Sequence, residues 1–138
     1  MPIKLHDQLQ ADCITLGRID SSLLLLHKNA LVPWFILIPD THENELYKLD
    51  AAQQTTVQKE INAIALFIEQ HFDTDKLNIA TLGNIVPQLH VHIIGRYVND
   101  FCWPNPVWGQ TESKPYSPAD VASLRQHLLE RHLLKEVS

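Results

Sequence analysis

The chain has 138 residues, of which 45% are hydrophobic and 20% charged, a balance typical of a globular protein with a buried core. A formal net charge of -5 without a concentrated basic stretch argues against binding to a nucleic-acid polymer, although a small nucleotide at a local site is compatible with it. The apolar runs are far shorter than the roughly 20 residues that span a bilayer, so we expect no membrane partner. Cys13 and Cys102 show no CxxC spacing and the N-terminus lacks the apolar core of a signal peptide, so we expect a cytoplasmic protein.

The first half of the chain is predicted to be mostly sheet. Two apolar segments, Cys13–Ile19 and Ser22–His27, are separated by Asp20 and Ser21, residues that favour a tight turn. This pattern predicts a β-hairpin. The run WFILIPD, residues 34–40, predicts a further buried strand that ends at its proline and aspartate.

The second half begins with a long helix. Apolar residues recur every three or four positions over residues 50–71, as on one face of an amphipathic helix. They are Val57, Ile61, Ile64, Ala65, Ile68 and Phe72. KLNIATL, residues 76–82, then predicts a strand, and residues 83–87 a short loop. The aromatic segment 101–109 is expected to be an irregular, packed loop. A C-terminal helix is predicted over residues 117–134, because Ser117, Pro118 and Asp120 suit its first turn.

Candidate functional residues lie in the run QLHVHII, residues 88–94. The strict alternation predicts a strand with Gln88, His90 and His92 on one face and the apolar residues on the core face. The histidines could be a hydrogen-bonded structural pair or two metal ligands, although no suitable third ligand follows them. One imidazole could instead attack phosphorus, with Gly83 and Asn84 in the preceding loop supplying phosphate donors or forming a simple turn.

These residues resemble a known family. NIVPQLHVHIIGR, residues 84–96, is similar to the signature of the histidine-triad (HIT) family of nucleotide hydrolases and transferases, and LVPWFILIP looks like the family's earlier strand. The segment FCWPNPVWG is similar to a tail in a bacterial branch labelled as diadenosine polyphosphate hydrolase-like. The resemblance covers about residues 15–109. It implies one HIT-like domain over residues 1–138, of the α+β class, with a mainly antiparallel sheet of about five strands, one long helix packed on it and a C-terminal helix.

The resemblance also implies an activity. His90 corresponds to the nucleophile that forms a nucleotidyl intermediate, and His92 to the histidine that contacts the phosphate near the scissile bond. The implied substrate is a small-molecule nucleotide, such as a dinucleoside polyphosphate or a nucleoside phosphoramidate, cleaved at the α-phosphorus. The covalent step itself requires no metal cofactor, and the family implies a homodimer.

Four positions depart from the family pattern. Gln88 replaces the first triad histidine, and it can order the site by hydrogen bonds but cannot carry a positive charge. His27 stands where the family has a ribose-binding acid or amide, and could still donate to a ribose hydroxyl or serve in aromatic packing. Phe35 replaces a further histidine and Ile85 a hydroxyl residue.

Two other functions remain open on this pattern, a nucleotide-binding sensor with little catalysis and a nucleotidyltransferase. The aromatic side chains around the motif are expected in the core or an interface, with base stacking as the alternative. They are Trp34, Phe35, Trp103 and Trp108.

Overall fold

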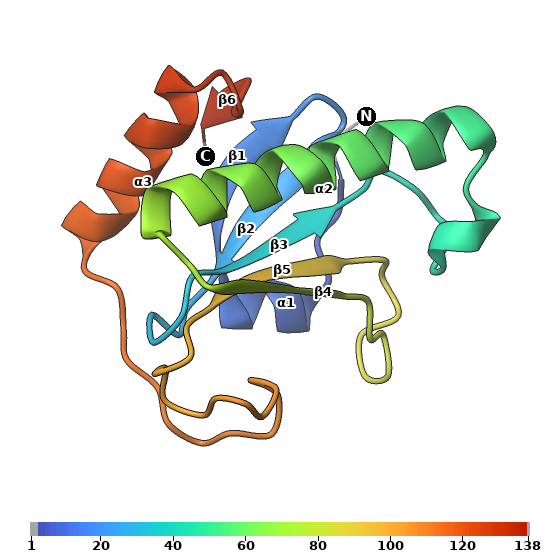
Figure 1. The fold of residues 1–138 in the computed structure, drawn as a ribbon. Coiled ribbons are helices and arrows are strands. Elements are labelled where there is room, and N and C mark those ends of the chain that lie inside the picture. The colour runs from blue at the N-terminus through green and yellow to red at the C-terminus, as the bar shows by residue number, and fades with distance from the viewer. Residues whose placement is uncertain (1–2, 138) are drawn as a thin grey trace.

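The computed structural model describes residues 3–137, and an antiparallel sheet forms the centre of the fold (Figure 1). The strands in chain order are β1 (Cys13–Ile19), β2 (Ser22–His27), β3 (Trp34–Ile38), β4 (Lys76–Ala80), β5 (Val91–Arg96) and β6 (Glu136–Val137). Their spatial order is β4-β5-β3-β2-β1-β6, and all neighbouring pairs are antiparallel. The helices are α1 (Asp7–Asp12), α2 (Ala51–Phe72) and α3 (Pro118–Glu130), with a short 3-10 helix, η1 (Leu46–Lys48). The predicted α+β class is confirmed, and the two-residue strand β6 is added to the five expected strands.

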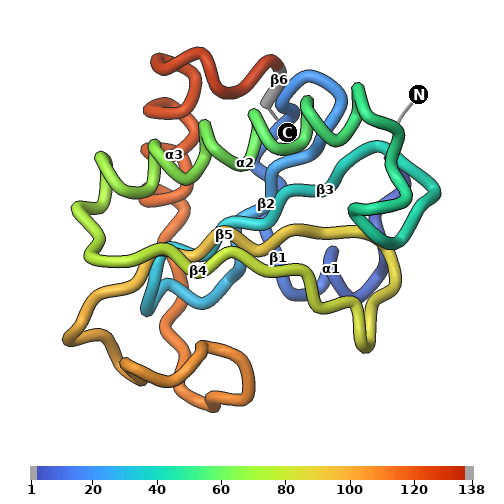
Figure 2. The backbone as a smooth tube through the Cα atoms, turned by 45° about the vertical axis from the view of Figure 1, so that its right-hand side comes forward, coloured from blue at the N-terminus to red at the C-terminus, as the bar shows by residue number. Residues whose placement is uncertain are grey.

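The helix α2 lies across one face of the sheet, as Figures 1 and 2 show from two directions. It begins after Asp50, whose carboxylate accepts a hydrogen bond from the Gln53 backbone N–H. It ends where Asp73 adopts a left-handed φ of 52°. Its buried side chains are Val57, Glu60, Ile61, Ile64, Phe67 and Ile68. The predicted amphipathic helix is therefore confirmed to within one residue at each end.

Apolar side chains cover both faces of the central strands. Phe35, Val91 and Ile93 point toward α2, whereas Trp34 and Ile36 belong to a second cluster on the opposite face. His92 pairs with Ile36 across β3 and β5, so its side chain also lies on the face away from α2. The sheet therefore separates the α2 core from the face that carries the two motif histidines.

The predicted motif strand is shorter than expected. β5 starts at Val91, not at residue 88, because its partners end there: Leu37 pairs with Val91 near the end of β3, and β4 ends where Ala80 pairs with His92. Pro39, directly after β3, has no N–H to extend the ladder.

The chain termini also differ from expectation. α3 ends at Glu130, four residues early, because His132 adopts a left-handed φ of 59° and turns the chain back. Glu136–Val137 then pairs with β1 at Gly17 and Arg18. The helix α1 was not predicted, since it has six residues and buries only Leu9. Among residues 3–137, none of the helices combines the length and the apolar character needed to cross a membrane.

The aromatic loop, residues 97–109, is packed around the buried side chain of Arg96, which is 1% exposed. Its guanidinium donates to Asp100 at 2.7 and 3.1 Å, to the Asn78 side chain at 2.9 Å and to the Asn105 carbonyl at 2.9 Å. Trp103 lies over the same group, with 5.5 Å between the guanidinium carbon and the ring centroid. One buried cation thus holds the irregular loop on β4 and β5.

Candidate active site

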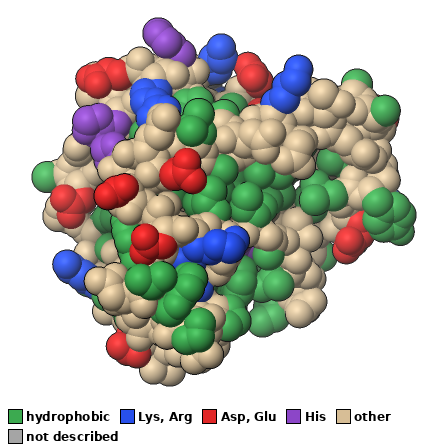
Figure 3. Space-filling view, in the orientation of Figure 1, with side chains coloured by type: hydrophobic (Ala, Val, Ile, Leu, Met, Phe, Trp, Pro, Cys, Tyr) green, Lys and Arg blue, Asp and Glu red, His purple; other side chains and the backbone are tan. Residues whose placement is uncertain are grey.

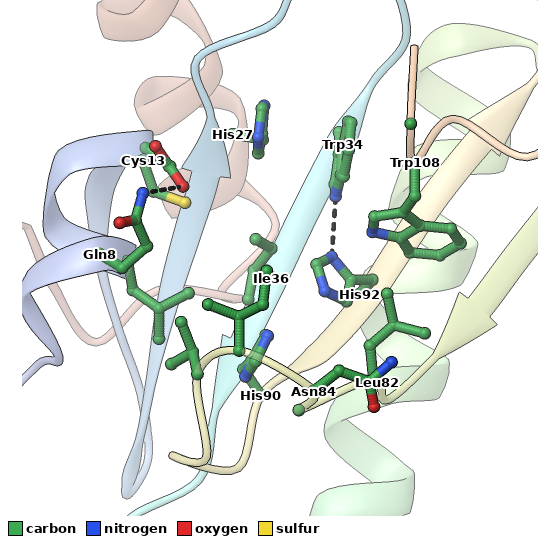
Figure 4. Close-up of a pocket in the computed structure, with 16 residues that line it drawn as sticks. Gln8, Cys13, His27, Trp34, Ile36, Leu82, Asn84, His90, His92 and Trp108 are labelled. Atoms are coloured by element: carbon green, nitrogen blue, oxygen red, sulfur yellow. Dashed lines mark hydrogen bonds between the residues drawn. The ribbon is translucent and has the colours of Figure 1, made fainter.

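A cleft of about 550 Å³ lies on the sheet face away from α2 (Figure 4). Its walls come from α1, the starts of β1 and β3, the end of β2, the loop before β5 and the aromatic loop. Five of the six predicted site residues line it: His27, Gly83, Asn84, His90 and His92. The structure therefore brings together residues that are as many as 65 positions apart in the sequence.

The backbone fixes the proton on His90. Its Nδ1 lies 2.6 Å from the carbonyl oxygen of Gln88, and a carbonyl can only accept, so Nδ1–H donates this bond. In the neutral ring the lone pair is then on Nε2. This arrangement gives His90 the tautomer that a nucleophilic nitrogen requires.

The proton on His92 is fixed the other way round. The indole Nε1–H of Trp34 donates to His92 Nδ1 at 2.9 Å, and Figure 4 shows this bond crossing from β3 to β5. An indole is a donor only, so His92 keeps its lone pair on Nδ1 and carries its proton on Nε2. Burial, followed by the nearby His90 and His27, lowers the pKa of His92 from 6.5 to about 3. His92 is thus a neutral donor 5.0 Å from His90 between ring centroids.

His27 is stacked on Trp34, with ring centroids 4.0 Å apart and planes 9° from parallel. Its Nδ1 accepts a hydrogen bond from the Asn29 backbone N–H at 3.1 Å. Burial lowers its pKa below the usual value of 6.5. The packing role expected for this side chain is present, and its Nε2 remains available to a molecule in the cleft.

The loop before β5 forms one wall of the cleft, to which residues 82–86 contribute. Gly83 has a φ of 67°, which glycine adopts without strain. Figure 4 draws Asn84 between His90 and Leu82, and its amide lines the cleft, where it can donate to a phosphate oxygen. Ile85, in place of a hydroxyl residue, is 88% exposed and lines the rim.

Gln88 does not line this cleft. Its side-chain amide accepts a hydrogen bond from the His6 backbone N–H at 2.8 Å and donates to the Lys4 carbonyl at 3.0 Å. The segment before α1 and the loop before β5 lie side by side in Figure 2, although these bonds join residues more than 80 positions apart in the sequence. Gln88 therefore meets His90 through its backbone carbonyl, and its side chain holds the segment that leads into α1.

The aromatic residues divide into two groups. Trp34 and Trp108 line the cleft, and the Trp108 ring meets the His92 ring edge-on with centroids 5.1 Å apart. Phe35 is fully buried in the α2 core, so the alternative prediction that it stacks on a base is wrong. Trp103 packs on Arg96 and does not line the cleft.

Sequence reasoning missed the contribution of α1. Gln8 donates to the carboxylate of Asp12 at 2.9 Å, and both residues line the cleft with Cys13. In Figure 4, Gln8 lies on the side away from His92 and Asn84.

Among the residues that the structure describes, no lysine or arginine lines the cleft. Within the same range, no three His, Cys, Asp or Glu side chains are grouped so that they could hold a metal ion.

The chain belongs to the HIT domain family, whose model matches residues 8–99. Histidine triad proteins from Marinobacter aquaeolei VT8 and Bradyrhizobium japonicum are both 38% identical to it, with TM-scores of 0.88 and 0.87, and each match covers 94% of this chain and 97% of the other. A histidine triad protein from Sinorhizobium meliloti 1021 is 32% identical, with a TM-score of 0.87 and coverage of 92% and 95%. No curated protein is significantly similar in sequence. The predicted HIT-like fold is confirmed.

Proposed function

We propose that the protein is a hydrolase that cleaves nucleoside phosphate derivatives at the α-phosphorus through a covalent nucleotidyl intermediate on His90. The complementary protonation of the two histidines carries this proposal: His90 presents a lone pair and His92, beside it, presents an N–H. Attack on a phosphate needs both a nucleophile and a donor for the oxygens that gain charge. Membership of the HIT domain family supports a nucleotide-binding role in hydrolysis or group transfer.

The proposed reaction has two displacements at phosphorus. The Nε2 lone pair of His90 forms a bond to the α-phosphorus, and the bond from phosphorus to the leaving group breaks. Nδ1–H stays on the ring, where its bond to the Gln88 carbonyl stabilises the positive charge of the substituted imidazole. Water then attacks phosphorus and the P–N bond breaks, with its electron pair returning to His90 Nε2. One proton of the water passes to solvent, and the nucleoside monophosphate leaves. His92 and Asn84 hold the phosphate oxygens, and the apolar walls that include Leu9 and Ile36 receive the nucleoside.

The substrate class follows from the family likeness and the motif tail. Dinucleoside polyphosphates and nucleoside phosphoramidates both carry an α-phosphorus with a leaving group, and the tail at residues 101–109 is similar to that of the diadenosine polyphosphate hydrolase-like branch. The role of Gln88 in ordering the site is proposed to pass through its backbone carbonyl and the segment before α1.

Intact-mass spectrometry of the protein mixed with such substrates tests the proposal. Wild-type protein should release nucleoside monophosphate and, after a rapid quench, carry one nucleotidyl group on His90. His90→Ala should abolish both while the far-UV circular dichroism stays unchanged, and His42→Ala, an exposed histidine that does not line the cleft, should behave as wild type. Turnover that persists in His90→Ala contradicts the mechanism.

Two further measurements distinguish this hydrolase from a nucleotide sensor and from a nucleotidyltransferase. Calorimetric binding of adenosine or guanosine monophosphate without turnover would identify a nucleotide sensor. Transfer of the nucleotidyl group to an added sugar phosphate would identify a transferase.

A homodimer formed through β4 is proposed as the working assembly. β4 is an edge strand, and Leu66 of α2 and Ile79 of β4 are 49% and 48% exposed. Figure 3 shows hydrophobic side chains gathered on this side of the molecule, below α2. Sedimentation velocity should give a dimer that Ile79→Lys converts to a monomer, whereas Val98→Lys, at another exposed apolar residue, leaves it intact. A monomeric wild type refutes the assembly.

A further inference from the structure

Hydrogen bonds hold the three histidines of the cleft in forms that cannot give a proton to a leaving group. His92 cannot take a second proton while the Trp34 indole donates to its Nδ1. His27 on β2 is restricted in the same way by the Asn29 backbone N–H. His90 already donates its Nδ1–H to the Gln88 carbonyl, and its Nε2 must stay unprotonated to attack.

The remaining titratable groups in the lining also fail as acids. Burial and the nearby Asp12 raise the pKa of the Cys13 thiol to about 12. The Asp12 carboxylate accepts a hydrogen bond from Gln8. Among the described residues that line the cleft there is no lysine or arginine. The cleft can therefore donate hydrogen bonds to phosphate, but it holds no group positioned to give a proton to a departing atom.

From this arrangement we infer that the site selects substrates by the acidity of the leaving group, so that it cleaves phosphoric anhydrides of nucleotides and discriminates against phosphoramidates. The inference rests on the proposed covalent mechanism and narrows its substrate class. Trp34 is the positioning residue for this preference, because its indole N–H occupies His92 Nδ1, the atom that would take a second proton in a site where burial already disfavours the charged ring.

The electron and proton balance explains the preference. When His90 Nε2 bonds to the α-phosphorus of an anhydride, the P–O bond breaks and the electron pair stays on a phosphate oxygen. That oxygen leaves without a proton, since the second pKa of a phosphate is about 6. A phosphoramidate must instead release an amine, whose nitrogen needs a proton as the P–N bond breaks, because amines have a pKa of about 10. The cleft supplies that proton poorly.

The test compares three substrates that share one nucleotide and differ in the departing group. They are the 4-nitrophenyl ester, the phenyl ester and the N-ethyl phosphoramidate of a nucleoside 5′-monophosphate, made with both adenosine and guanosine. The two esters are nearly the same shape, but the nitro group makes the departing phenol far more acidic. We measure kcat/KM, which covers the steps through cleavage of the bond to the leaving group, and follow the adduct on His90 by intact mass.

The wild type should cleave the 4-nitrophenyl ester at least about 100-fold faster in kcat/KM than the other two, the range expected when general-acid assistance is missing. In Trp34→Phe, which keeps a ring against His27 but loses the N–H, the ratio of the two esters at pH 6 should fall about threefold. His92 Nδ1 is then open to a proton that can assist departure, and burial still limits the protonated fraction. Trp108→Phe is the matched control. The Trp108 ring also touches His92, but its Nε1 makes no hydrogen bond within the described structure, so the wild-type ratio should remain.

Similar kcat/KM values for the three substrates in the wild type would overturn the inference and leave the covalent mechanism in place. A steep dependence that Trp34→Phe does not change would overturn the role of Trp34. If no substrate is cleaved and no adduct forms on His90, the proposed function itself fails, and the inference fails with it.

Discussion

The uncharged state of His92 makes a quantitative prediction for stability at acid pH. In the folded protein its pKa is lowered from 6.5 to about 3, chiefly by burial, and the side chain is only 6% exposed. In the unfolded chain the same imidazole takes up a proton below pH 6.5. Between these two values the unfolded state binds one more proton than the folded state, so the stability from His92 is present above pH 6.5 and is lost as pH falls toward 3.

The size of the loss follows from the linkage relation. Each pH unit in this window lowers the free energy of unfolding by about 1.4 kcal/mol, which amounts to about 2.7 kcal/mol at pH 4.5. We propose to compare wild type with His92→Gln, since glutamine does not titrate and its side-chain oxygen can accept the Trp34 N–H. His27 and His71, whose pKa values burial also lowers, are present in both proteins and cancel in the comparison.

Urea unfolding monitored by far-UV circular dichroism at pH 7.0, 5.5 and 4.5 provides the measurement. At pH 7.0 the difference in the free energy of unfolding between the two proteins sets the baseline. By pH 4.5 this difference should have shifted by about 2.7 kcal/mol in favour of His92→Gln. Parallel pH dependence of the two proteins would refute the reasoning, because it would mean that His92 takes up its proton equally well in the folded state.

Three further substitutions test other parts of the structure. Gly95→Ala should lower stability by about 2 kcal/mol in urea unfolding, because the added Cβ would lie 2.7 Å from Ile68 Cγ2 in a closed core; an unchanged unfolding midpoint would contradict this packing. Asp100→Ala should cost about 3 kcal/mol or more and expose residues 97–109 to limited proteolysis, because it leaves Arg96 buried without a counter-charge; wild-type resistance to protease would be the contrary result. Gln88→Ala should raise KM about fivefold and leave kcat unchanged, because the lost bonds to the segment before α1 loosen a wall of the cleft and cost about 1 kcal/mol of substrate binding. A fall in kcat would instead mean that the Gln88 side chain takes part in the chemistry.

The faces of the motif were predictable from the sequence, and the extent of its strand was not. Side chains alternate with a period of two, which placed Val91 and Ile93 in the core and His90 and His92 together on the other face. Where β5 begins depends on where β3 and β4 stop, and those strands are distant in sequence. The alternation within residues 88–94 carries no information on where the neighbouring strands end.

The bond that governs His92 was also beyond sequence reasoning. Trp34 reaches His92 because β3 and β5 pair with Trp34 opposite Ile94 and Ile36 opposite His92. A shift of one residue in that register would turn the indole to the other face. The helix α1 was missed for a different reason: six residues with one buried side chain give too little periodicity to detect, and the helix is held by contacts such as those of Gln88 with the segment before it.

The two edges of the sheet are unequal. On the β1 edge, Arg125 of α3 donates to the carbonyls of Thr15 and Leu16, the Lys135 N–H donates to the Arg18 carbonyl, and β6 pairs alongside. β4, at the opposite edge, has a strand neighbour on one side only. β6 is the edge strand on the other side, but its two residues offer far fewer backbone groups to an added strand than the five of β4. In the proposed homodimer, two copies meet through β4 around a twofold axis and each covers the other's longer edge. Among the described strands, the only edges left in such a dimer are the two short β6 strands, and an edge of two residues is a poor template for the strand addition that builds fibres.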